Sequence, residues 1–150
     1  MITDYQDELP GFKQVFPIDV KWGDMDAMRH VNNTRYFYYA ESARLEFLLT
    51  LFPELNSTDQ DQLGSGMALA YADFKFKVPV TYPDKLWVGT AVAEIAETEF
   101  QLEHQIYSTK LGCVAAQGTA RLVFYDFKLG KRKAFDDKMR QVLNSYSIDS

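Results

Sequence analysis

Alternation of apolar and polar residues predicts a half-buried strand at residues 15 to 22. Four apolar side chains fall on one face of this segment, and Asp19 and Lys21 fall on the other. A period of two residues is typical of a strand with one face buried. The side chains predicted to face the core are Phe16, Ile18, Val20 and Trp22.

The period changes between residues 34 and 52, where apolar side chains recur every three or four positions. This spacing predicts a helix of about 19 residues that Pro53 ends. Apolar residues cover more than half of the helix circumference, so we expect other elements to surround it. The apolar series includes Tyr36, Ala40, Ala43, Phe47 and Leu51, widened by Phe37, Leu48 and Phe52.

Four further strands and a short helix are predicted after a polar, acidic loop at residues 53 to 66. The strands are expected at residues 71–78, 85–95, 100–107 and 113–127, and the amphipathic tail helix contains Phe135, Met139, Val142 and Tyr146. Consecutive strands favour an antiparallel sheet and hence an α+β fold. We expect a curved five-stranded sheet wrapped around the long helix, with a second subunit covering its remaining edge and faces.

Composition indicates a single globular domain over residues 1–150. Hydrophobic residues make up 47% of the chain and charged residues 25%, which excludes a disordered chain and a disulfide scaffold. Aromatic residues reach 15%, and so many rings require a thick core, a ligand pocket or an oligomer interface.

The net charge of −5 argues against nucleic-acid binding, which requires a basic face. Cys113, the one cysteine, excludes an internal disulfide, and together with only two histidines it argues against a zinc site. Residues 1–12 do not look like a secretory signal, and no apolar run approaches the length of a membrane span. We therefore expect a soluble, cytoplasmic protein without a metal.

The densest group of reactive residues lies in the loop at residues 23 to 33, between the first strand and the long helix. A helix start offers free backbone N–H groups and positive partial charge, so a carboxylate there either caps the helix or reacts. Composition alone favours the capping interpretation. The polar residues of the loop are Asp24, Asp26, Arg29, His30, Asn32 and Asn33.

Three segments together resemble the hotdog-fold acyl-CoA thioesterases of the 4-hydroxybenzoyl-CoA thioesterase group. They are DMDAMRHVNNTRYFYYAESARLEFL at residues 24–48, FKFKVPVTYPDKLWVGTAV at residues 74–92 and YDFKLGKRKAF at residues 125–135. The first segment includes the helix pair Glu41 and Arg44. The resemblance implies a hotdog fold, hydrolysis of acyl-CoA, and a homodimer or a dimer of dimers with its pocket between subunits.

The resemblance also implies roles for individual residues. Asp26 aligns with the catalytic carboxylate, and Asp24 becomes a turn residue. His30 and Asn33 fall on the polar helix-entry positions and, with Tyr36, are expected to contact the substrate. No cofactor is implied, because CoA is part of the substrate.

Two departures from the family pattern change the expectations for this chain. Arg29 stands where the family commonly has glycine, the residue that tolerates positive φ. Residues 97–99 read Glu-Thr-Glu where some members carry basic residues that contact CoA phosphates. Contacts to the CoA phosphates must then come from elsewhere. One candidate is a basic run after the last long strand, and the alternative interpretation of that run is a solvated turn that binds nothing. The basic run is Lys128, Lys131, Arg132 and Lys133.

The chemistry of thioester hydrolysis suits such a loop. A thiolate leaves easily, since a cysteine-like thiol has a pKa of ~8.5, so the site needs a carboxylate and oxyanion donors more than a strong acid. One alternative is a non-catalytic protein that binds acyl-CoA or a fatty acid. Another is a hydratase or dehydratase, which would place a histidine on the helix, whereas His30 lies in the loop.

Two other candidates are weaker. His104 lies on the apolar face of a predicted strand, where a histidine is usually a satisfied core residue. Cys113 has no charged neighbour in sequence to activate it, so we expect a structural role. The identity of the acyl group does not follow from the sequence.

Overall fold

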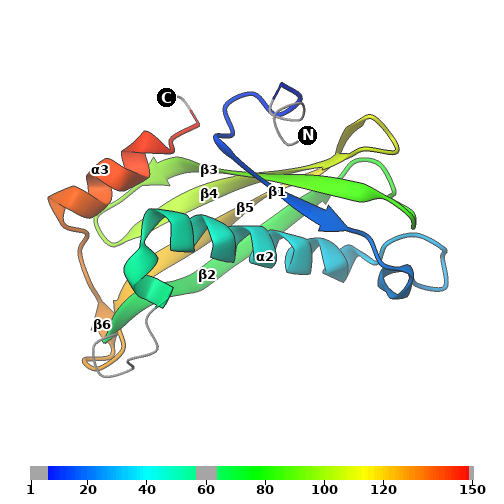
Figure 1. Ribbon diagram of the computed structural model, residues 1–150. Coiled ribbons are helices and arrows are strands. Elements are labelled where there is room, and N and C mark those ends of the chain that lie inside the picture. The colour runs from blue at the N-terminus through cyan, green and yellow to red at the C-terminus, as the bar shows by residue number, and fades with distance from the viewer. Residues whose placement is uncertain (1–6, 57–63, 149–150) are drawn as a thin grey trace.

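The computed structural model describes residues 7–56 and 64–148, so the central part of the predicted loop at residues 53–66 lies outside the described residues. The chain forms one sheet, a long helix and a short carboxyl-terminal helix (Figure 1). The elements are β1 (Gln14–Asp19), η1 (Trp22–Asp24), α2 (Asn33–Leu51), η2 (Pro53–Asn56), β2 (Ser65–Phe76), β3 (Lys85–Ile95), β4 (Glu99–Ser108), β5 (Cys113–Asp126), β6 (Lys131–Arg132) and α3 (Asp137–Ser145).

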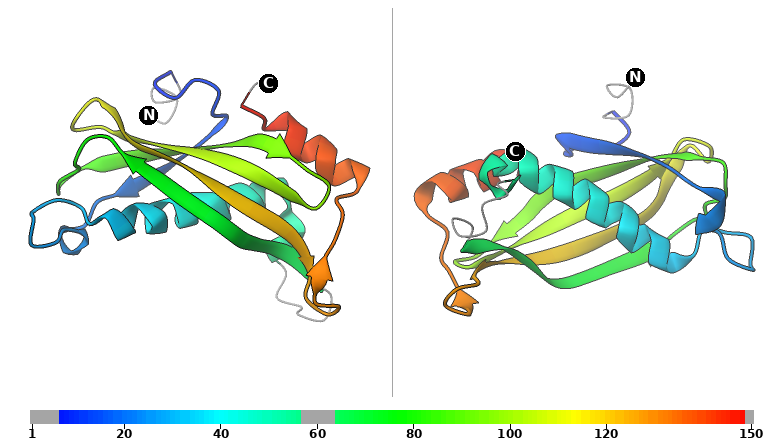
Figure 2. Two further views of the ribbon diagram at one scale, coloured as in Figure 1. Left: turned by 180° about the vertical axis from the view of Figure 1, so that it is seen from behind. Right: turned by 60° about the horizontal axis from the view of Figure 1, so that its bottom comes forward.

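The strands pair in the order β1-β3-β4-β5-β2, antiparallel throughout, and β6 adds to β5. The sheet curves around α2, which lies along its concave face, as the views from behind and below show (Figure 2). The predicted α+β hotdog fold is therefore confirmed. The two-residue strand β6 was not predicted, because two residues are too few to show a period.

Helix α2 has the 19 residues expected from the pattern, shifted by one position. Asn32 is the N-cap, and its side-chain oxygen accepts the N–H of Thr34 at 2.9 Å. Phe52 is the C-cap, and Pro53 follows it. None of the described helices is long and apolar enough to cross a membrane.

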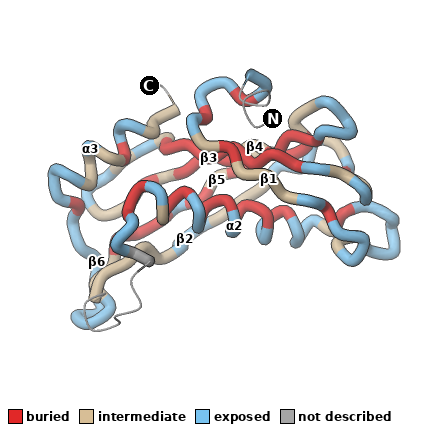
Figure 3. The backbone as a smooth tube through the Cα atoms, viewed as in Figure 1, coloured by how far each residue is buried: buried red, intermediate tan, exposed pale blue. Residues whose placement is uncertain are grey.

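The core lies between α2 and the concave face of the sheet (Figure 3). Near the carboxyl end of α2, Phe47 packs against Phe100 and Leu102. Nearer the start of the helix, Tyr36 and Ala43 pack against residues of β3 and β5. The apolar stripe of α2 is therefore buried as expected except at Phe37, which stays 38% exposed.

The first strand ends earlier than the alternation predicts. Strand β1 stops at Asp19, and Trp22 belongs to η1 with 73% of its surface exposed, so its predicted place in the core is wrong. The physical reason is local: Asp24 accepts the backbone N–H of Lys21 at 3.0 Å, which turns the chain before the alternation reaches Trp22.

The segment before β1 covers the other face of the sheet. Leu9 and Phe12 are buried against Trp87, Ala91 and Tyr107, a second small cluster. Alternation along β3 places Trp87 and Ala91 on the face opposite Val88 and Val92. This burial was not predicted, because Leu9 and Phe12 lie in a polar segment without a period.

Strand β2 forms one end of the sheet and is bordered by exposed apolar side chains. Its register with β5 shifts between Leu69 and Tyr71. An edge strand presents unpaired backbone groups, and large apolar residues from both β2 and α2 stay partly exposed beside it. These residues are Phe37, Tyr38, Leu45, Leu69, Tyr71 and Phe76.

Candidate functional site

The loop before α2 is a tight turn held by its own backbone. Met25 and Val31 form an isolated bridge, and the N–H of Asp26 donates to the carbonyl of His30 at 3.1 Å. Arg29 sits at the tip with φ of +65°, the left-handed conformation that glycine adopts more readily. The family's usual glycine therefore corresponds to a real conformational demand, which this chain meets with an arginine.

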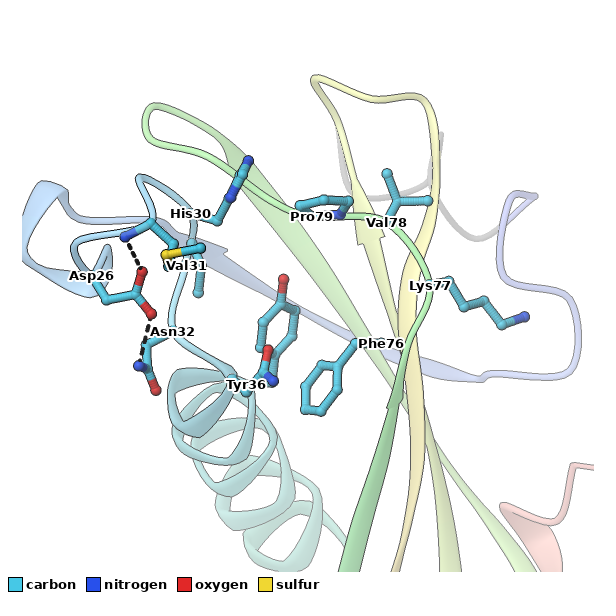
Figure 4. Close-up of a pocket in the computed structure, with 11 residues that line it drawn as sticks. Asp26, His30, Val31, Asn32, Tyr36, Phe76, Lys77, Val78 and Pro79 are labelled. Carbon is cyan, nitrogen blue, oxygen red and sulfur yellow. Dashed lines mark hydrogen bonds between the residues drawn. The ribbon is translucent and has the colours of Figure 1, made fainter.

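The carboxylate of Asp26 is oriented by two donors from the same loop. Its Oδ1 accepts the backbone N–H of Met28, and its Oδ2 accepts the side-chain Nδ2 of Asn32, both at 2.9 Å (Figure 4). Asp26 is exposed to solvent in the described chain. Because Asn32 also caps α2, the start of the helix and the orientation of Asp26 depend on one side chain.

Asp24 has structural partners, in agreement with its expected role as a turn residue. Its Oδ2 accepts the hydroxyl of buried Tyr39 at 2.7 Å and the N–H of Lys21. Burial, followed by the hydrogen bond to Asp24, raises the pKa of Tyr39. The Nε of Arg35 lies 3.9 Å from Asp24 Oδ1. These contacts tie the loop to α2.

A cavity of about 370 Å³ opens beside Asp26 (Figure 4). It brings together the four residues proposed from the sequence, Asp26, His30, Asn33 and Tyr36. The remaining lining residues are Met28, Val31, Asn32, Phe76, Lys77, Val78 and Pro79. The cavity thus lies between the loop, the first turn of α2 and the segment that leaves β2.

The sequence analysis placed Asn32 among the polar residues of the loop but gave it no role at the site, and it missed the wall formed by residues 76 to 79. The capping role of Asn32 agrees with the preference for asparagine at a helix start. The wall could not have been predicted, because about fifty residues separate it from Asp26 and only the sheet brings it near. Val31 N–H donates to the carbonyl of Val80 at 2.8 Å, which joins the two segments.

Tyr36 and Phe76 form the aromatic side of this cavity. Tyr36 is buried, with burial raising the pKa of its phenol, and its ring packs edge-on against Phe76 at 5.0 Å. The two rings offer an apolar surface within the same cavity as an exposed carboxylate. Such a cavity can hold an apolar group while Asp26 reaches a polar atom attached to it.

The basic run lies far from this cavity. Lys128 lies between β5 and β6, Lys131 and Arg132 form β6, and Lys133 follows it. These residues lie at the opposite end of α2 from the loop that contains Asp26 (Figure 1). Arg132 faces Glu99 at 3.4 Å, and Lys133 reaches Ser65. Within one subunit, the run does not contribute to the cavity, whereas Lys77 lines it.

The buried histidine differs from its expected satisfied state. His104 is 1% exposed, and its Nδ1 lies 3.1 Å from Thr90 Oγ1, but its Nε2 has no hydrogen-bond partner in the described structure. Burial, with the charge of Arg44 as a smaller cause, lowers the pKa of His104 to about 3. The imidazole is therefore neutral near pH 7.

Comparison with known proteins gives one consistent family. The family model described as the thioesterase-like superfamily matches residues 20–143. The chain is 29% identical over 119 residues to the acyl-CoA thioesterase YbgC of Haemophilus influenzae, covering 79% of this chain and 83% of that protein.

Solved structures agree in fold. The PA2801 protein of Pseudomonas aeruginosa superposes with a TM-score of 0.76 at 26% identity, over 87% of this chain and 97% of that one. The BH1999 gentisyl-coenzyme A thioesterase superposes with a TM-score of 0.74 at 26% identity, over 87% and 99% of the two chains.

Proposed function

The chain belongs to the thioesterase-like superfamily, and from that membership we propose that it hydrolyses an acyl-CoA thioester to the free acid and CoA. Asp26 is the nucleophile or general base. The observation that carries the proposal is the Asp26 carboxylate, oriented by Met28 and Asn32 beside a cavity at the start of α2. Its named relatives, an acyl-CoA thioesterase and a gentisyl-coenzyme A thioesterase, support the thioester as the substrate class.

In the general-base route, Asp26 takes a proton from a water molecule whose oxygen bonds to the thioester carbon. The C–S bond then breaks as the carbonyl re-forms, and the thiolate of CoA leaves and takes up a proton. In the nucleophilic route, a carboxylate oxygen of Asp26 attacks the carbon itself, the C–S bond breaks and the thiolate of CoA leaves and takes up a proton. Water then hydrolyses the resulting anhydride and restores the Asp26 carboxylate. Both routes need the carboxylate ionised and within reach of the carbonyl.

The first turn of α2 supplies a donor for the oxyanion that forms on the carbonyl oxygen. Asn32 accepts the N–H groups of Thr34 and Arg35. The N–H of Asn33, the first of the helix, has no acceptor within the helix and lies at the positive end of the helix dipole. We assign it to the oxyanion, with His30 and the Asn33 side chain contacting the substrate's polar atoms and Tyr36 its acyl group.

The CoA part of the bound substrate is expected to extend out of the cavity along β2. Lys77 lines the cavity and is exposed, so its ammonium group is placed to contact a CoA phosphate. The functional unit is a homodimer or a dimer of dimers, in which the partner covers the apolar surface beside β2. The reaction requires no metal, because the carboxylate alone activates water.

Turnover of a panel of acyl-CoA substrates, followed by release of free thiol, tests the proposal. We expect turnover that persists after treatment with a chelator. One observation favours a non-catalytic acyl-CoA binding protein as the second candidate: both oxygens of Asp26 already accept hydrogen bonds from its own loop. Binding of acyl-CoA by calorimetry without thiol release from any member of the panel would favour that candidate and contradict hydrolysis.

A further inference from the structure

The turn between β5 and β6 projects from a corner of the molecule, at the opposite end of α2 from the loop that contains Asp26 (Figure 1, Figure 2). It carries two large apolar side chains that are largely open to solvent, since Phe127 is 56% exposed and Leu129 is 67% exposed (Figure 3). Turns favour Gly, Pro, Asn, Asp and Ser at such positions. Neither side chain belongs to the apolar surface beside β2 that the partner subunit is expected to cover, so both need another explanation.

The shape of this turn is fixed by the residue that precedes it. Oδ1 of Asp126 accepts the backbone N–H groups of Lys128 and Leu129, both at 3.0 Å, and its carbonyl accepts the N–H of Gly130 at 2.8 Å. Gly130 has a φ of +67°, a conformation that glycine adopts without strain. The apolar tip is therefore held in place before any partner arrives, which lowers the ordering cost of binding.

Positive charge surrounds the apolar tip. Lys131 forms no ion pair with any described residue, and Lys133 reaches the neutral hydroxyl of Ser65 at 3.4 Å. Arg132 lies 3.4 Å from Glu99, so its charge is partly compensated. In a chain with a net charge of −5, the turn is thus a local region of opposite sign. The four cations, all exposed, are Lys128, Lys131, Arg132 and Lys133.

These charges have no role at the Asp26 cavity within one subunit, because the turn lies at the other end of α2 (Figure 1). A polynucleotide suits them poorly, since the chain as a whole is acidic. An acidic peptide pairs with the cations but leaves Phe127 and Leu129 in water. An anionic bilayer accommodates both features. Its boundary between headgroups and acyl chains receives apolar side chains, and lysines reach its phosphates while their stems follow the apolar surface.

We propose that residues 127–133 dock reversibly on the surface of a membrane that contains anionic phospholipids. Phe127 and Leu129 enter the interface, and the neighbouring lysines contact lipid phosphates. One apolar tip gives only marginal membrane binding, and a basic patch is the second signal that strengthens it. The proposal does not depend on the proposed hydrolysis. It places such an enzyme beside the bilayer, into which the acyl chains of long-chain substrates and of their fatty-acid products partition.

Sedimentation with vesicles tests the proposal on the wild-type protein. One set of vesicles contains equal parts of phosphatidylglycerol and phosphatidylcholine, and the other contains phosphatidylcholine alone. We expect binding to the anionic vesicles and binding weaker by at least about tenfold to the neutral ones. Binding to the anionic vesicles should also weaken as salt rises, because the Debye length falls from ~10 Å at about 0.1 M to ~3 Å at about 1 M salt.

Substitutions in the turn separate the two parts of this surface. A variant with Lys128→Gln, Lys131→Gln and Lys133→Gln should bind anionic vesicles about a hundredfold more weakly, at about fivefold for each cation. Leu129→Ser should weaken binding by about tenfold, through loss of apolar burial. The matched control loses three exposed lysines at the Asp26 end of the molecule, so its net charge changes equally, and it should bind within about threefold of wild type. Its substitutions are Lys21→Gln, Lys85→Gln and Lys110→Gln.

Leu129→Trp supplies an optical signal from the tip itself, compared with wild-type protein, which contains Trp22 and Trp87. We expect tighter binding, because tryptophan favours the membrane interface, and a shift of the emission to shorter wavelength with anionic vesicles. Absence of wild-type binding, an unshifted emission, or an equal loss of binding in the control variant overturns the proposal. So does a lower mass by light scattering for the lysine variant or for Leu129→Ser, since the turn would then be a contact between copies of the chain.

Discussion

Two aspartates only two positions apart have different partners, and those partners predict different effects of substitution. Asp26→Asn removes the charge that either route of hydrolysis requires. The turnover number should fall by roughly 10²–10⁴, the range for loss of a general base. Stability should also fall slightly, because the new amide nitrogen meets the Nδ2 of Asn32, which donates to Asp26. Thiol release is measured at a temperature at which the variant is fully folded.

Asp24→Asn is the matched control for Asp26→Asn. Asp24 accepts the hydroxyl of buried Tyr39 and the N–H of Lys21, so weakening these bonds should lower the free energy of unfolding by about 1–2 kcal/mol and spare turnover. Near wild-type turnover in Asp26→Asn, together with a large drop in melting temperature, would identify Asp26 as a structural cap instead.

Arg29 offers a test of backbone strain at the tip of the same loop. Its φ of +65° costs an L-residue about 1–2 kcal/mol, and glycine removes that cost but loses part of the gain to unfolded-state entropy. Arg29→Gly should therefore stabilise the protein by about 0.5–1 kcal/mol, measured by urea unfolding. Arg29→Ala removes the same side chain but keeps Cβ, so it should give no comparable gain.

At the scale of elements, the pairing of β2 with β5 depends on one glycine. Gly118 lies opposite Phe74, and a Cβ added there would come within 2.1 Å of the carbonyl oxygen of Asp73 and 2.9 Å of the Phe74 ring. The close approach of the strands places Phe74 beside Tyr36 and Phe76, the rings that line the Asp26 cavity. The strand pairing and the site are therefore linked through this position.

Gly118→Ala should destabilise the protein, because the clash involves backbone as well as a ring. We expect a loss of about 2 kcal/mol or more, seen as a drop of roughly 4–8 °C in Tm by calorimetry. Gly23→Ala is the control, since an added Cβ there meets no atom within 4 Å. Equal melting temperatures for the two variants would contradict the packing argument.

At the scale of the molecule, the unpaired edge of β2 and the apolar side chains beside it predict self-association. Burying such side chains is favourable by about 25 cal/mol per Å², and an edge strand pairs readily with another copy. Light scattering should therefore give a mass of at least twice 17.3 kDa at micromolar concentration. A mass of 17.3 kDa alone would contradict both the dimer and the view that the exposed rings are an interface.

The sequence by itself determined the elements and the loop that holds the candidate site. The periods of β1, β3, β4, β5 and α2 were strong enough to predict their boundaries within a few residues, because alternation and helical spacing are local properties. The predicted start of β2 at residue 71 was wrong, since the strand begins at Ser65. The same holds for the polar loop at residues 23–33, whose carboxylates and helix-entry residues are neighbours along the chain. The error at Trp22 was also local, since the turn held by Asp24 stops the strand before its alternation ends.

Only the tertiary structure decided which distant groups meet. Phe76 and Lys77 reach the Asp26 cavity because β2 ends beside the start of α2. Arg44 of α2 and His104 of β4 line one cavity although sixty positions separate them. Such contacts join residues forty to sixty positions apart, and no period along the chain encodes them. They follow from the register and curvature of the sheet, which depend on all of its strands at once.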